Sequence, residues 1–176
     1  MLVFFIFLQF LALTFIFYIF IAALIGAPFL PSGKNAVKQM VNMADIKKGD
    51  ICTDLGSGDG RIVMEMAKKG ARVYGLEVNP FLVLWSRFRI KKAHLENNAM
   101  IVWKSFWKED FYKYDVITVY GIPNIMPRLE KKLLKETNSD VRIISYLFRF
   151  PNLKIQKNNN GVFLYRLKKY SQSESN

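Results

Sequence analysis

Hydrophobic side chains are concentrated at the amino terminus of the chain. Residues 2–27 read LVFFIFLQFLALTFIFYIFIAALIGA, in which only Gln9 and Thr14 are clearly polar. A bilayer core of about 30 Å is crossed by a helix of about 20 apolar residues, so this run predicts one transmembrane helix. A cleaved signal peptide would need a basic leading region and a shorter apolar core, and Pro28 follows the only plausible cleavage site. A domain of this size could not enclose the run as a core helix.

Charged side chains are absent from residues 1–32 and abundant afterwards. All 26 basic and 14 acidic residues, and therefore the net charge of +12, belong to the rest of the chain. Basic residues mark the cytoplasmic flank of a membrane helix, and four follow this one: Lys34, Lys38, Lys47 and Lys48. We therefore expect a single-pass membrane protein with its larger domain in the cytoplasm. The basic surface suits the anionic headgroups of a lipid bilayer, and nucleic acid is the less favoured partner.

Short apolar runs alternate with amphipathic segments in the remainder. The pattern predicts strands at 51–55, 72–76, 100–103, 115–120 and 141–148, and helices at 36–43, 61–69, 81–95 and 124–136. In the last helix, the residues predicted to face the core are Ile125, Leu129, Leu133 and Leu134. Two further strands at 153–156 and 162–167 flank an Asn-Asn-Asn-Gly turn and predict an antiparallel hairpin. This alternation is typical of an α/β fold with a mostly parallel, Rossmann-like sheet covered by helices on both faces.

The layout predicts four segments along the chain. They are a transmembrane helix at 1–27, a connector with a short helix at 28–50, an α/β domain at 51–168 and a flexible polar tail at 169–176. The single Cys52 excludes an internal disulfide, and with the single His94 it excludes a metal site built on several cysteines or histidines. We expect no metal.

The segment Asp54-Leu55-Gly56-Ser57-Gly58-Asp59-Gly60-Arg61 joins a predicted strand to a predicted helix, the setting of a nucleotide-binding loop. Its glycines follow G-x-G-x-G, whereas a dinucleotide fingerprint needs glycine where Arg61 stands. Two carboxylates beside the loop would repel a pyrophosphate and attract the sulfonium and ammonium groups of S-adenosylmethionine. The alternative is a simple turn. We predict a site for S-adenosylmethionine formed by Asp54, Gly56, Ser57, Gly58, Asp59 and Gly60.

Glu77 ends the second predicted strand, where an acidic residue can accept hydrogen bonds from both ribose hydroxyls of a nucleoside. A solvated strand end is the alternative interpretation. Asn79 and Pro80 follow and predict a capped start of the next helix. We include Glu77 and Asn79 among the cofactor-binding candidates.

Candidates at the ends of the third and fourth strands carry weaker signals. Ser105 and Phe106 follow the third strand, where this kind of fold usually binds adenine, and Phe106 could lie near the ring. Tyr120 and Asn124 follow the fourth strand, where the methyl acceptor and the methyl group should meet. They are the catalytic candidates. A core aromatic residue and an ordinary helix start are equally good interpretations there.

With its terminal hairpin, the predicted sheet is the seven-stranded pattern of class I methyltransferases, and several motifs make the resemblance more specific. The chain resembles the membrane-anchored protein-lysine methyltransferases that include the mitochondrial enzymes modifying the ATP synthase c-subunit and the adenine nucleotide translocase, with their prokaryotic relatives. The matching residues extend from Pro28 to Pro151: PFLP at 28–31, DLGSGDGRIV at 54–63, GLEVNP at 75–80, Ser86-Arg87, Trp107-Lys108, YGIP at 120–123, LEKKL at 129–133 and RFP at 149–151. Ser105 departs from the aspartate usual in this fold, which puts the adenine contact in doubt.

The resemblance implies S-adenosylmethionine-dependent N-methylation of a lysine in a membrane protein, a reaction in which Tyr120 and Asn124 would align the acceptor amine. Three other functions remain open on the sequence alone: an RNA or small-molecule methyltransferase, a non-catalytic binding module that retains the cofactor fold, and a dinucleotide oxidoreductase. The apolar amino-terminal run disfavours the first, the intact glycine loop with Asp54 and Glu77 disfavours the second, and Arg61 disfavours the third.

Overall fold

The computed structural model describes residues 1–25, 33–138 and 140–167, with side chains to residue 17 in the first range. The chain divides into two compact units, Met1–Leu30 and Pro31–Asn176. Most of the predicted connector turn and the predicted tail at 169–176 lie outside the described residues.

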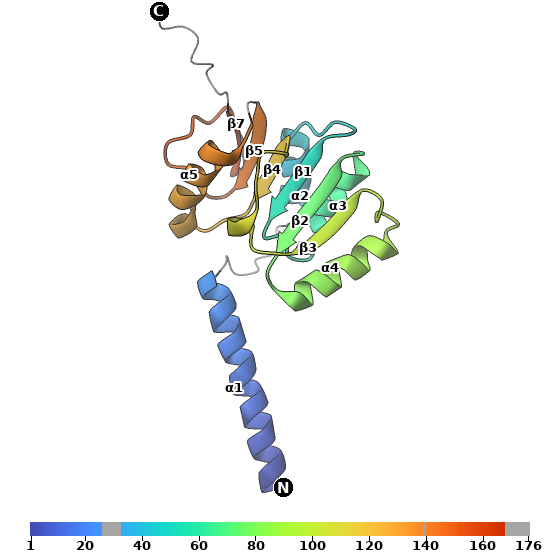
Figure 1. Cartoon of the computed structure of the whole chain (residues 1–176), viewed down its shortest axis with the longest axis vertical. Helices are drawn as coiled ribbons and strands as arrows, with labels where there is room; N and C mark the ends of the chain where they lie inside the picture. The colour runs from blue at the N-terminus through green and yellow to red at the C-terminus, as the bar shows by residue number, and fades with distance from the viewer. Residues whose placement is uncertain (26–32, 139, 168–176) are drawn as a thin grey trace, which may run out of the picture. The chain divides into compact units, whose positions relative to one another are not determined.

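The first unit contains one helix, α1, from Leu2 to Ile25 (Figure 1). Its described side chains are all exposed, and the Thr14 hydroxyl donates to the carbonyl of Phe10 at 2.7 Å within the helix. In the part of the chain that the structure describes, no helix satisfies the length and hydropathy required of a membrane span. The transmembrane helix stays a prediction.

The second unit is built on a seven-stranded sheet in the order β3-β2-β1-β4-β5-β7-β6 (Figure 1). β1 to β5 are parallel, and β7 runs antiparallel between β5 and β6. This confirms the predicted fold of the domain. The strand bounds are β1 Ile51–Leu55, β2 Arg72–Glu77, β3 Ala99–Trp103, β4 Val116–Val119, β5 Val141–Tyr146, β6 Lys157–Asn159 and β7 Val162–Leu167.

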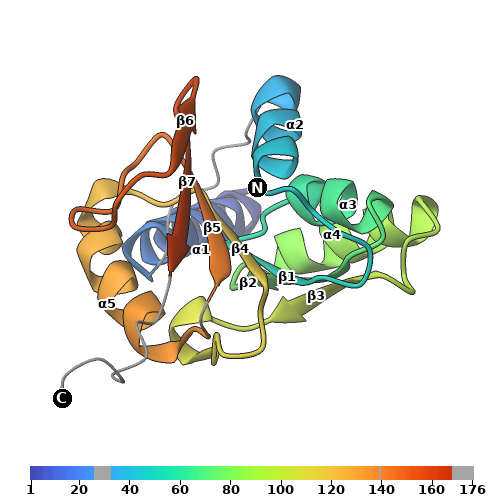
Figure 2. The ribbon, with the colours of Figure 1, turned by 90° about the horizontal axis from the view of Figure 1, so that it is seen from above.

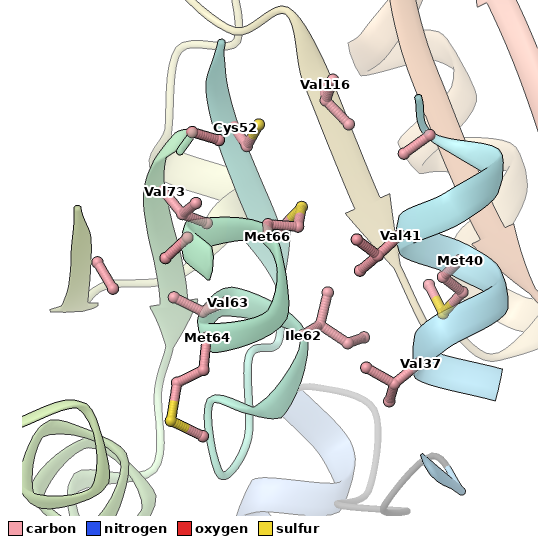
Figure 3. Packing of buried hydrophobic residues seen from close by; sticks show 14 of the residues in the cluster. Val37, Met40, Val41, Cys52, Ile62, Val63, Met64, Met66, Val73 and Val116 are labelled. Carbon is pink, nitrogen blue, oxygen red and sulfur yellow. The ribbon is translucent and has the colours of Figure 1, made fainter. Parts of the chain in front are cut away.

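Helices cover both faces of the sheet, as the alternating pattern predicts (Figure 2). Helices α2 (Lys34–Met43), α3 (Arg61–Lys68) and α4 (Pro80–Lys92) pack on one face. Figure 3 shows Met40 and Val41 of α2 beside Ile62 of α3 in that cluster. The other face is covered by α5 (Met126–Glu136), by two short 3-10 helices, η1 (Phe106–Lys108) and η2 (Pro123–Ile125), and by the loop that follows η1.

The terminal hairpin begins later than the sequence pattern predicts. The first arm is β6 at Lys157–Asn159, so the predicted strand at 153–156 is wrong. Asn160 and Gly161 form the turn with φ of 45° and 77°. A two-residue hairpin loop of type I′ needs positive φ at both central positions, which Asn-Gly accepts readily. The strand must therefore end at Asn159, directly before the turn.

The predicted inner face of the last helix is wrong at one position. Met126, Leu129 and Leu133 of α5 are buried, whereas Leu134 is 49% exposed. One helical residue turns the side chain by about 100°, which carries Leu134 away from the face that Leu133 occupies. Glu130 takes the remaining inward position and accepts two hydrogen bonds from Asn152.

Candidate functional site

The strand order reverses between β1 and β4, and ligands of parallel α/β sheets bind outside the carboxyl ends of the strands at such a point. Three polar or small residues are in register there. Asp54 near the end of β1 pairs with Gly75 of β2 on one side and with Thr118 of β4 on the other. The predicted cofactor residues around the glycine loop are therefore brought to the reversal point of the sheet.

The loop after β1 turns back over the end of β2. The backbone N–H groups of Gly56 and Ser57 donate to the carbonyl of Leu76 at 2.9 and 3.0 Å. Gly56, Gly58 and Gly60 adopt φ of 77°, 54° and 76°, a region that favours glycine. The glycine spacing is thus a requirement of the backbone path.

Glu77 is 7% exposed and binds this loop to β2. Its Oε2 accepts from Gly58 N at 2.9 Å, and its Oε1 accepts from Val78 N and Asn79 N at 2.9 and 2.8 Å. A carboxylate offers about four lone-pair positions, so about one remains for a ligand. The solvated-strand-end interpretation is wrong, and the carboxylate has room for one further hydroxyl where two were expected.

Asp54 is a buried carboxyl group that forms no ion pair with a base among the residues that the structure describes. It is 2% exposed, and its Oδ1 accepts from the Thr118 hydroxyl at 2.7 Å. Burial raises the pKa of Asp54 from 3.8 to about 7, against the lowering effect of the Thr118 hydrogen bond, and the carboxylates of Glu77 and Asp59 raise it further. A cationic ligand beside Asp54 would favour the ionised form.

Asp59 differs from Asp54 because two arginines hold it. The Arg61 guanidinium lies 2.7 Å from Oδ2, and Arg89 of α4 binds the same oxygen. Burial acts to raise the pKa of Asp59, but the Arg61 hydrogen bond and the charges of Arg89 and Arg61 outweigh it, so the pKa is below its ordinary value. The expectation that Asp59 presents free negative charge to a ligand is therefore wrong, because the protein neutralises it. Selection against a pyrophosphate then depends on Asp54.

The Ser57 side chain is enclosed beside β2. Its hydroxyl oxygen has no hydrogen-bond partner. Every other buried polar side-chain atom that the structure describes has one. A Cβ built on Gly75 would lie 2.7 Å from this oxygen and 2.6 Å from Cδ1 of Ile101. A buried hydroxyl without a partner costs free energy, so Ser57 is suited to a ligand that supplies one.

Three further cofactor candidates have their side chains engaged within the fold. The Asn79 Oδ1 accepts from Phe81 N and Leu82 N at 3.0 and 3.3 Å and caps α4. Ser105 Oγ accepts from Trp107 N at 3.4 Å at the start of η1. Phe106 is 8% exposed and packs against Trp107 with ring centroids 4.8 Å apart. Each lies where the sequence predicts, but none presents an uncommitted side-chain oxygen or an open ring face.

The two catalytic candidates have different surroundings. Tyr120 follows β4 and is half-buried, and its ring meets Tyr146 edge-on at 5.1 Å and lies nearly parallel to Phe148 at 6.4 Å. Asn124 is exposed in η2. Sequence reasoning missed Tyr146 and Phe148, although both stand at the end of a predicted strand beside the strand that leads to Tyr120.

A tight turn after β5 positions Phe148. Leu147 has φ of 64°, and Phe148 N donates to Tyr146 O at 2.9 Å across it. A three-residue turn with positive φ is rare and strained, and strained residues cluster at functional sites. The turn carries the chain from Tyr146 to Phe148 so that both rings contact Tyr120.

Comparison with known proteins agrees with this geometry. Residues 54–157 match the family described as the ANTKMT methyltransferase domain, and this range includes the glycine loop, Glu77 and the three aromatic rings. The chain belongs to the ANTKMT methyltransferase domain family. The family resemblance inferred from the motifs is confirmed.

Relatives in this family carry related names. The human lysine N-methyltransferase named for the ATP synthase c-subunit is 38% identical over 71% of this chain and 53% of its own length. A protein-lysine N-methyltransferase of Saccharolobus islandicus is 29% identical over 78% of this chain and 92% of its own length. The chain spans about half the length of the vertebrate relatives it matches.

Solved structures support the fold assignment. An RNA methyltransferase from Salinibacter ruber, solved in complex with S-adenosyl-L-homocysteine, superimposes with a TM-score of 0.74 and 27% identity. The match covers 84% of this chain and all of that one. A seven-stranded class I methyltransferase sheet is therefore the fold of the second unit.

Proposed function

We propose that this chain is an S-adenosylmethionine-dependent methyltransferase that N-methylates a lysine of a membrane protein. The observation that carries the proposal is that two buried carboxyl groups and an aromatic cluster lie at the carboxyl ends of neighbouring strands. Asp54 and Glu77 form the first, and Tyr120 with Tyr146 and Phe148 forms the second. Membership of a methyltransferase family supports the same reaction class.

The residues around the glycine loop fit the cofactor. Glu77 Oε2 retains a position for one ribose hydroxyl, and Ser57 Oγ has no hydrogen-bond partner within the described part of the chain. Asp54 is a buried acid that a cation would ionise. S-adenosylmethionine, when bound, supplies a methyl group on a positively charged sulfur. Asp54 and Glu77 would hold its cationic and ribose parts, and the glycine backbone would allow close approach.

The aromatic cluster fits the acceptor. A lysine ammonium has a pKa of about 10.4 in water and must lose its proton before the nitrogen can accept a methyl group. Aromatic rings bind a cationic or partly methylated amine through their faces, and removal from water favours the neutral amine. We assign to Tyr120 the role of aligning the amine, with Tyr146 and Phe148 shaping the site, and leave Asn124 as a weaker candidate because it is exposed.

The membrane location is part of the proposal. Residues 2–27 are uncharged and largely apolar, and residues 2–25 are helical in α1 with exposed side chains as far as residue 17. We infer that α1 anchors the chain as a single-pass protein with the methyltransferase domain in the cytoplasm. The names of the relatives refer to the ATP synthase c-subunit and to the adenine nucleotide translocase, which supports a membrane-embedded acceptor.

The test is transfer of a labelled methyl group. The purified full chain is incubated with tritiated S-adenosylmethionine and host membranes, and the labelled band is analysed by mass spectrometry. We expect methyl-lysine in a membrane protein, with much less label for Tyr120→Ala. Labelled RNA with unlabelled membrane protein would refute the lysine assignment and favour the activity named for the Salinibacter relative. Alkaline carbonate extraction and a carboxyl-terminal reporter fusion test the anchor and its orientation.

A further inference from the structure

The outer side of α4 is apolar although it faces solvent. Leu84, Trp85 and Phe88 are 64%, 53% and 56% exposed. The residues that α4 buries are Val83, Ser86 and Ile90, which lie on the opposite side at helical spacing. Trp85 and Phe88 stack on each other, with ring centroids 5.8 Å apart. A contiguous apolar face of this kind marks an interaction surface in a soluble domain.

Trp103 extends this surface at the edge strand. It is 65% exposed at the end of β3, and its indole N–H donates to Val78 O at 2.9 Å. Val78 follows Glu77 directly and lies two residues before α4 begins. The apolar face therefore adjoins the carboxyl edge of the sheet, where the candidate site lies.

Basic side chains border the apolar face on both sides. Helix α4 contains no acidic residue and carries four basic ones: Arg87, Arg89, Lys91 and Lys92. At helical spacing Lys92 continues the outward row of Trp85 and Phe88. Arg89 lies on one side of this row, and Lys91 lies on the other side, next to Leu84. Aromatic rings flanked by lysine and arginine are the composition of helices that lie in a membrane interface.

A basic pocket lies on the same face of the sheet. It has a volume of about 290 Å³ and is lined by residues of α2, α3 and α4, namely Lys34, Val37, Lys38, Arg61, Met64, Glu65, Lys68 and Arg89. Five of these eight residues are basic, but Arg61 and Arg89 pair with Asp59, and Lys68 pairs with Glu65. The positive charge that the pocket offers to a ligand therefore comes mainly from Lys34 and Lys38 of α2. Such a pocket complements a phosphate group.

We propose that the outer face of α4 and the adjoining basic pocket dock onto an anionic lipid bilayer, with Leu84, Trp85 and Phe88 in the interface and a lipid phosphate at the pocket. The charge of the pocket and the combination of rings with basic residues favour lipid over a second copy of this basic chain. The chain from Ile25 to Lys34 extends at most about 30 Å, so an anchored α1 keeps the domain within reach of the bilayer. This inference rests on the proposed function, since docking in this orientation would bring the carboxyl edge of the sheet close to a lysine embedded in the membrane.

The experiment uses the full chain reconstituted in phosphatidylcholine vesicles with and without phosphatidylglycerol. An environment-sensitive fluorophore is attached at Phe88→Cys, since the native Cys52 is buried. We expect a blue-shifted emission and quenching by lipid-borne quenchers in the anionic vesicles. The matched control is Lys131→Cys on α5, which covers the other face of the sheet and is exposed; its label should stay aqueous.

A charge variant tests the electrostatic part. The double variant Lys38→Gln, Lys92→Gln replaces two exposed basic side chains. It should lower the equilibrium constant for docking by roughly thirtyfold, given the usual contribution of each basic residue near an anionic surface. Quenching of the native tryptophans by brominated lipid checks the result in the unmodified chain.

Two results would overturn the proposal. One is a label at position 88 that is as aqueous in anionic vesicles as the label at position 131. The other is shielding that appears equally in lipid-free detergent and grows with protein concentration, which would identify a second copy as the partner. Neither readout needs a cofactor or an acceptor, so a failure of docking is distinguished from a failure of the methylation assay.

Discussion

Replacing Asp54 by asparagine should stabilise the ligand-free domain by an amount that depends on pH. The pKa of Asp54 is raised from 3.8 to about 7 by burial. The folded state therefore holds a proton that the unfolded state has lost, and wild-type stability falls as pH rises from about 4 to about 7. At 1.36 kcal/mol per pH unit, the raised pKa of Asp54 lowers the free energy of unfolding by about 4 kcal/mol at pH 8 and by about 2 kcal/mol at pH 5.

The amide introduced by Asp54→Asn would not titrate, and its oxygen can still accept from the Thr118 hydroxyl. The constant cost of burying the amide cancels when the two pH values are compared. We therefore expect the stability advantage of Asp54→Asn over the wild type to grow by roughly 2–3 kcal/mol between pH 5 and pH 8.

The assay is urea unfolding of the full chain in mild detergent, followed by tryptophan fluorescence. Trp85, Trp103 and Trp107 all lie in the second unit, so the signal reports that domain. Asp140→Asn is the matched control, because that side chain is 65% exposed and its ion pair with Arg166 is a surface one. An advantage of Asp54→Asn that is the same at both pH values would refute the raised pKa.

The same carboxyl group makes cofactor affinity depend on pH. S-adenosylmethionine is cationic and should bind the ionised form of Asp54, so wild-type affinity should rise by about tenfold from pH 5.5 to pH 7. In Asp54→Asn, binding should be weaker and nearly independent of pH over this range. Calorimetry measures both, and a wild-type affinity that falls with rising pH would contradict the assignment.

The remaining predictions concern three other positions. Glu77→Ala removes three backbone hydrogen bonds and an acceptor for the ligand. Calorimetry should therefore show S-adenosylmethionine binding weakened by about 1.5–3 kcal/mol, and unchanged affinity would remove Glu77 from the site. Gly75→Ala places a Cβ 2.6 Å from Ile101 and 2.7 Å from Ser57. Urea unfolding should show a free energy of unfolding lower by about 1–3 kcal/mol, and an unchanged value would contradict this packing. Tyr120→Phe should keep most of the lysine methylation activity, whereas Tyr120→Ala should lower kcat without changing cofactor affinity. Equal activity of the two variants would show that the ring of Tyr120 has no role in the reaction.

Much of the fold is determined by local sequence. Strand β1 occupies the predicted residues 51–55, and β2 extends the predicted 72–76 by one residue, because short apolar runs between polar turns have few other ways to bury their side chains. The Asp-Leu-Gly-Ser-Gly-Asp-Gly loop is likewise local, since its glycines supply the positive φ that the turn requires. The family could be inferred from the same motifs.

Charge state and side-chain partners were decided by tertiary structure. Asp54 and Asp59 are both carboxylates of the glycine-loop motif, yet only Asp59 is neutralised. Arg61 pairs with Asp59 locally, and α4 brings Arg89 to it from 30 residues away. Tyr146 and Phe148 contact Tyr120 because β4 and β5 pair in register and a strained turn at Leu147 redirects the chain. The outer face of α4 was decided in the same way. Apolar residues lie on most sides of this helix, mixed with four basic ones, so helical periodicity cannot tell which side meets the sheet. Packing on β2 and β3 leaves Trp85 and Phe88 in solvent.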